Sequence, residues 1–138
     1  MDTVFQLSNL LVLPFWILMI VLPHWRWTKR ILGSLWPVVP FVALYAILIL
    51  PQLGNALGSL LNPTLPGIIA LLSRPEAATA GWVHYLAFDL FVGRWAYLDS
   101  RERNLSAWLV SPILFIILLL GPFGFLLYLI ARLMRQTR

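Results

Sequence analysis

Long stretches of the chain carry no charged side chain. They cover residues 3–23, 31–73 and 104–131 of the 138 residues. A helix needs about 20 predominantly apolar residues to cross a ~30 Å hydrocarbon layer, so each stretch is long enough to hold a membrane span. The chain is 61% hydrophobic and 11% charged. A water-soluble domain is excluded, because too few polar side chains are present to cover its surface.

These uncharged stretches predict an all-α fold, a polytopic transmembrane helical bundle of four spans plus an interfacial or re-entrant segment. All residues from 1 to 138 then form a single integral membrane domain. The first apolar stretch is followed by no small-residue cleavage site, so we expect a retained span and not a signal peptide. The spans are expected at about residues 3–22, 35–50, 81–98 and 107–131. Pro112 and the sequence GPFG at 121–124 are expected to break the last of them.

The segment 51–73 is uncharged, but prolines, Asn62 and Gly67 interrupt it. Irregular backbone at membrane depth must be covered by protein or line a water-filled cavity. We therefore expect an interfacial or re-entrant segment here, with a fifth crossing as the alternative. With four crossings the lysines and arginines divide five against four between the two sides, whereas five crossings divide them seven against two. A strong bias to one side is typical of membrane proteins, which favours the alternative. These counts include the tail residues Arg132, Arg135 and Arg138.

The formal net charge is +5 at pH 7. The basic residues flank apolar stretches in short groups, such as Arg26, Lys29 and Arg30. We interpret them as anchors that face lipid phosphates and not as a surface for nucleic acid. The chain has no cysteine and two histidines, His24 and His84. This supply of ligands predicts no metal, haem or other cofactor, and His24 is interpreted as an interfacial residue.

The third expected span contains three ionisable side chains, His84, Asp89 and Arg94. An ionisable group inside a span costs at least about 2.5–3.5 kcal/mol on insertion scales, so each one is a hypothesis for function. Their different directions around the helix favour a position at the centre of the bundle. We name His84 and Asp89 as candidate catalytic residues. The structural alternative is that Asp89 locks the bundle by pairing with an arginine or bonding Asn9, and that the long side chain of Arg94 extends to the membrane boundary near Asp99.

Kinked helices and many aromatic rings would suit a slot for a long apolar ligand. Gly93 lies one turn from Asp89, where the missing side chain would let a flat ligand or a neighbouring backbone approach the carboxyl group. The candidate substrate contacts are Asn9, Trp16, Tyr85, Gly93, Arg94 and Trp95.

Four stretches carry a family resemblance: NLLVLPFWILM at residues 9–19, PHW at 23–25, WVHYLAFDLFVGRW at 82–95 and GPFGFLLY at 121–128. They resemble the abscisic-acid-deficient-4-like family of small plastid and cyanobacterial membrane proteins. The motif at residues 82–95 is the specific part. The chain is similar to the bacterial members, because it lacks the long N-terminal extension of the plant proteins.

The resemblance implies carotenoid chemistry. Plant members of the family are required to make neoxanthin from violaxanthin, an isomerisation in which an epoxide opens to an allenic alcohol with no net redox change and no electron carrier. The reaction needs an acid near the epoxide oxygen and a base near the carbon that loses a proton. His84 and Asp89 lie at positions that match the motif.

We therefore predict a multi-pass protein of the plasma or thylakoid membrane that acts on a carotenoid or related isoprenoid, with the lipid bilayer as its other partner and no nucleic acid. The alternative is a non-enzymatic protein. Such a protein would be a small subunit of a homo-oligomer or larger membrane complex, or a factor that binds and delivers pigment.

Overall fold

The structure is a computed structural model that describes the backbone of residues 1–136 and the side chains of residues 1–134. Arg138, one of the cations counted above, lies outside the described residues. The described part of the chain is helical and contains no strand. Its elements are α1 (Asp2–Val21), α2 (Arg26–Gly33), α3 (Val39–Ile49), the 3-10 helix η1 (Leu50–Gln52), α4 (Leu53–Leu61), α5 (Leu65–Leu72), α6 (Pro75–Glu102) and α7 (Ala107–Gln136).

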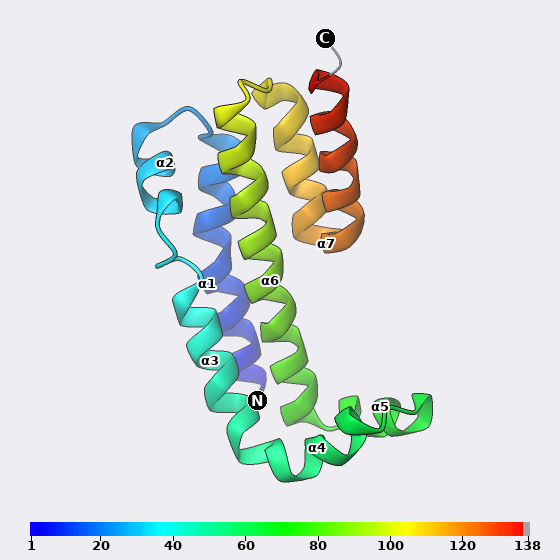
Figure 1. Ribbon diagram of the computed structural model, residues 1–138. Helices are drawn as coiled ribbons and strands as arrows, with labels where there is room; N and C mark the ends of the chain where they lie inside the picture. Colours follow the sequence, from blue (N-terminus) through cyan, green and yellow to red (C-terminus); the bar gives the residue numbers. More distant parts are fainter. Residues whose placement is uncertain (137–138) are drawn as a thin grey trace.

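The long helix α6 holds the others together (Figure 1). It packs against α1, α2, α3, α5 and α7, and it extends beyond the predicted span 81–98 at both ends. The expected central position of this helix is therefore present. Its neighbours do not surround it, however, because Tyr85 and Phe88 are about 60% exposed on one side.

At Gly93 the helix α6 packs directly against the Trp16 ring of α1. A Cβ atom on this glycine would lie 2.8 Å from Cζ3 of Trp16, whose side chain is 1% exposed. Higher in the bundle, the Tyr97 hydroxyl donates a hydrogen bond to the Pro23 carbonyl at 2.8 Å. The packing of α1 against α6 is therefore stabilised by the Trp16 ring on Gly93 and by the hydrogen bond from Tyr97 to the loop that follows α1.

The helix α7 reverses direction at Leu120 and Gly121, whose backbone angles are not helical. The second half then lies against the first. A Cβ atom on Gly124 would be 2.6 Å from the Cα atom of Ile117, and residues seven apart in a straight helix would be about 10 Å apart. The close backbone contact shows that α7 is a helical hairpin.

Both ends of α7 lie at the C-terminal end of α6 (Figure 1). A straight helix would separate Ala107 from Arg132 by about 38 Å, yet the guanidinium group of Arg132 bonds Asp99 near the end of α6. The expected crossing of the membrane by 107–131 is therefore not confirmed. The break predicted at Pro122 is the point of reversal, because proline has no N–H for the helical ladder and clashes with the preceding turn.

The region after α3 differs in detail from the prediction. The second span was expected over 35–50, and the α-helix there, α3, is shorter. Pro51 lies in η1, where the chain bends, and α4 and α5 then run across the end of the bundle (Figure 1). The segment 51–73 is thus helical for most of its length, and neither a re-entrant path nor a fifth crossing is confirmed.

Three helical stretches are long and apolar enough to cross a membrane by length and composition. They are Asp2–Val21, Val39–Leu61 and Ala107–Met134. The helix α6 is not among them, because His84, Asp89 and Arg94 lower its mean hydropathy. Four spans plus a re-entrant segment are thus not confirmed.

Candidate functional site

A cavity of about 480 Å³ lies between α6 and the turn of the α7 hairpin. Its volume falls within the ~300–1,000 Å³ typical of small-molecule sites. Most of its wall is apolar or aromatic, and the exceptions are His84, Tyr85 and Asp89. The lining residues are Trp82, His84, Tyr85, Leu86, Phe88, Asp89, Val92, Leu118, Leu119, Leu120, Gly121, Pro122 and Phe125.

The carboxyl group of Asp89 faces the turn of the hairpin. A Cβ atom on Gly121 would lie 3.0 Å from the Asp89 carboxyl carbon, so only glycine leaves room for this side chain. The second half of α7 begins at this turn. Within the described residues, Asp89 makes no hydrogen bond or ion pair. The pairing with an arginine or with Asn9, given as the structural alternative, is therefore absent among the described residues.

The imidazole of His84 lies among aromatic rings. Its centroid is 4.7 Å from the ring of Phe88, 5.4 Å from that of Tyr45 on α3 and 6.2 Å from that of Tyr85. No side chain or carbonyl of the described residues bonds its nitrogens. The two candidate catalytic groups, His84 and Asp89, thus line one cavity with their polar atoms unused.

Of the six candidate substrate contacts, only Tyr85 lines this cavity. Asn9 accepts a hydrogen bond from the Trp82 indole at 2.8 Å, so it positions a lining residue. Trp16 packs on Gly93 in the core, so the flat group that approaches this glycine belongs to the protein itself.

Arg94 and Trp95 also have structural partners. Arg94 donates to the carbonyls of Ser34 at 2.8 Å and Gly33 at 3.0 Å. These carbonyls end α2, where a cation is favourable. Arg94 therefore has structural partners, as the alternative to a substrate contact expects, but they lie at the end of α2. Trp95 lies edge-on to Tyr128, with centroids 5.7 Å apart, and beneath the Arg132 guanidinium.

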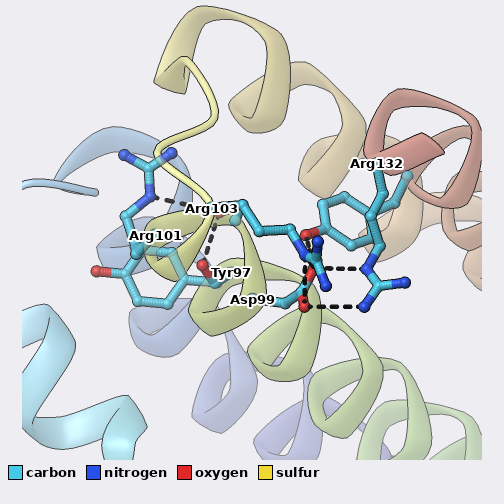
Figure 2. A network of polar contacts seen from close by, with 7 residues as sticks. Tyr97, Asp99, Arg101, Arg103 and Arg132 are labelled. Atoms are coloured by element: carbon cyan, nitrogen blue, oxygen red, sulfur yellow. Dashed lines mark hydrogen bonds and ion pairs between the residues drawn. The ribbon is translucent and has the colours of Figure 1, made fainter. Parts of the chain in front are cut away.

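A second polar cluster, absent from the sequence prediction, centres on Asp99 (Figure 2). Its carboxylate accepts hydrogen bonds from Arg103 at 2.9 Å, Arg132 at 3.0 Å and the Tyr128 hydroxyl at 2.6 Å. Asp99 lies just beyond the predicted span 81–98. Burial raises its pKa, but the three hydrogen bonds outweigh burial and hold the pKa below its ordinary value. This cluster ties the returning half of α7 to α6.

One signal in the sequence pointed to this cluster. Asp99 and Arg103 are four residues apart, as are Tyr128 and Arg132, so each pair shares a helix face. Their meeting depends on the hairpin. Among the described residues, no group of three or more histidine, aspartate or glutamate side chains is placed to hold a metal ion.

In the described residues, the helices and the cavity define a helical protein with the apolar character of a membrane protein and an apolar cavity lined by one histidine and one aspartate. The chain belongs to the family described as ABA DEFICIENT 4-like, which matches residues 3–128. It is 31% identical over 111 residues to Protein ABA DEFICIENT 4, chloroplastic, from Arabidopsis thaliana, an alignment that covers 76% of this chain and 50% of that protein. The chain thus spans about half the length of this curated relative. No solved structure matches the chain.

Proposed function

We propose that the chain is a multi-pass membrane protein with three crossings and one re-entrant hairpin. The crossings are α1, the segment 35–52 that contains α3 and η1, and the middle of α6, and α7 enters and leaves on the same side. Each half of the α7 hairpin has room for about 13–15 residues, or roughly 20 Å of helix, which is less than the ~30 Å hydrocarbon layer.

The distribution of cations supports this topology. In the described chain, the side that holds the C-terminal ends of α1 and α6 carries seven lysines and arginines, and the opposite side carries Arg74 alone. This bias is stronger than in either arrangement considered from the sequence. Under the positive-inside rule, the seven-cation side faces the cytoplasm or the equivalent plastid compartment. The members of this group are Arg26, Lys29, Arg30, Arg101, Arg103, Arg132 and Arg135.

Cysteine accessibility tests the topology on a clean background, because the chain has no native cysteine. Ser106→Cys and Leu133→Cys lie near the two ends of α7, and Ser73→Cys lies at the opposite end of the bundle. A membrane-impermeant maleimide is expected to label the first two from one side and Ser73→Cys from the other. Labelling of Ser106→Cys and Leu133→Cys from opposite sides would make α7 a crossing.

For the activity, we propose a cofactor-free acid/base isomerisation of an epoxide on a carotenoid or related isoprenoid, in the thylakoid or plasma membrane. The observation that carries the proposal is that His84 and Asp89 line one apolar cavity with unused polar atoms. Tyr85 and Phe88 line the cavity and are also exposed on the face of α6, so a long apolar chain can lie along this face in the bilayer while its end ring enters. The relative's link to chloroplasts supports the thylakoid location.

The chemistry assigns a role to each group. Asp89 donates a proton to the epoxide oxygen as the C–O bond breaks, which leaves a hydroxyl group. His84 accepts the proton that leaves the neighbouring carbon, and the electron pair of that C–H bond forms the new double bond of the allene. Proton and electron counts balance with no oxidant or reductant. Transfer of a proton back from the histidine to the carboxylate restores both groups.

Asp89→Asn separates catalysis from packing. Asparagine keeps the volume, but it has no transferable proton. We expect the variant to accumulate normally in membranes and to leave violaxanthin unconverted, as measured by chromatography of the pigments. The matched control is Phe91→Leu, on α6 but outside the cavity, which should convert pigment as the wild type does.

The same experiment tests the non-enzymatic alternative. Full conversion by Asp89→Asn at normal abundance would remove Asp89 from catalysis. If His84→Gln also converted violaxanthin fully, the protein would be a pigment-binding factor or a subunit of a larger complex. Loss of the protein itself in Asp89→Asn would assign the carboxyl group to packing of the hairpin.

A further inference from the structure

A second and larger cavity, of about 870 Å³, lies at the end of the bundle where the cations collect. It is open on one side and is lined by the end of α1, the connector after it, the end of α6 with the following loop, and the first turns of α7. It shares no lining residue with the cavity around Asp89. The lining residues are Ile20, Val21, Pro23, His24, Arg101, Asn104, Leu105, Ser106, Ala107, Trp108, Ser111, Pro112 and Phe115.

The charge in this cavity is uncompensated. Three arginines surround the end of α6, and two of them, Arg103 and Arg132, form ion pairs with Asp99. Arg101 lies on the other side of the helix (Figure 2), and no carboxylate of the described residues pairs with it. No aspartate or glutamate lines the cavity.

Arg101 is held in place and still has free donors. Its Nη2 atom donates to the Leu105 carbonyl at 2.6 Å, and its Nε atom lies 3.3 Å from the Ser100 hydroxyl. A guanidinium group has five N–H donors, so three are left for a ligand. A fixed, unpaired guanidinium in a concave site favours a phosphate or another oxyanion.

The walls of the cavity divide into a polar and an apolar part. His24, Asn104 and Ser106 lie with Arg101 toward the loops, whereas Ile20, Val21 and Phe115 continue down α1 and α7. Trp108 is 92% exposed at the rim, as is typical of indoles at the level of lipid headgroups.

We propose that this cavity is a binding site for an amphiphile with an anionic headgroup, such as an acidic membrane lipid. The headgroup oxyanion binds Arg101, and a hydrocarbon chain lies along Ile20, Val21 and Phe115. The proposal does not depend on the pigment chemistry, because the two cavities are separate.

The test uses purified protein in a neutral detergent and measures its unfolding temperature. Phosphatidylglycerol is added to one sample, phosphatidylcholine with the same chains to a second and inorganic phosphate to a third. A ligand that binds only the folded protein raises the unfolding temperature in proportion to its occupancy. We expect a dose-dependent rise with phosphatidylglycerol alone. Equal rises with the two lipids, or with inorganic phosphate alone, would overturn the proposal.

Two variants and one control locate the site. Arg101→Gln is expected to weaken the apparent affinity for phosphatidylglycerol by about tenfold or more, because it removes the charged hydrogen bonds between the guanidinium group and the headgroup. Ser111→Phe fills the cavity without changing its charge and should also abolish the response. Arg103→Gln removes the same charge at the same end of α6 but outside the cavity, so its response should persist. A response to phosphatidylglycerol that survives both Arg101→Gln and Ser111→Phe would place the lipid elsewhere and refute the site.

Discussion

Replacing Gly93 with alanine tests the packing of α1 on α6. The added Cβ atom would lie 2.8 Å from Cζ3 of Trp16. Carbon atoms pack best at about 3.5–4.0 Å, so the ring must move by roughly 0.7 Å or more. The indole is 1% exposed, so its movement disturbs the surrounding core.

The expected cost follows from two opposing effects. Overpacking a core costs about 1–3 kcal/mol, and replacing glycine by alanine in a helix recovers about 0.5–1 kcal/mol. We expect a net loss of about 1–2 kcal/mol in the free energy of unfolding. The assay is loss of helical circular dichroism during titration of purified protein with sodium dodecyl sulfate.

Matched variants make this result specific. Gly58 lies within α4, and no atom lies within 4 Å of the position that an added Cβ atom would take, so Gly58→Ala should raise stability by about 0.5–1 kcal/mol. Combining Gly93→Ala with Trp16→Phe makes room for the methyl group, so the double variant should lose less stability than the sum of the single losses. The reasoning is refuted if Gly93→Ala is as stable as the wild type.

Gly121→Ala should destabilise the hairpin and reduce pigment conversion, because its Cβ atom would collide with the Asp89 carboxyl group; combination with Asp89→Ala should restore the unfolding temperature but not the conversion. Asp99 has a lowered pKa, so its ionised form stabilises the fold above the unfolded-state value near 3.9, and this contribution is lost as the pH falls through the folded-state pKa. The difference in unfolding temperature between wild type and Asp99→Asn should therefore be full at pH 7 and shrink below about pH 4. Arg94→Met should lower stability by about 1–3 kcal/mol, because it removes two charged hydrogen bonds to the end of α2. Pigment conversion by the protein that remains folded should be unchanged. A loss of conversion without loss of folded protein would instead support the prediction that Arg94 contacts the substrate.

Local sequence features predicted part of the candidate site. His84, Tyr85 and Asp89 are polar groups in an apolar helix, and their cost in a membrane marks them without any knowledge of their neighbours. The partners of Arg94 and Trp16 were not predictable in this way, because they belong to α2 and α6 and meet only in the folded bundle.

The sequence by itself determined the helical, membrane-compatible character of the chain and the family to which it belongs, because hydropathy and helix-breaking residues act over one or two turns of chain. It also placed the break at Pro122. Only the tertiary structure decided that α7 turns back there, since a proline can kink a helix as well as end it. The reversal depends on Gly124 packing on Ile117 and on the bonds between Arg132 and Asp99. Because contacts between distant residues set the direction of the returning helix, the same contacts decide which cations are paired and which one is left to face the second cavity.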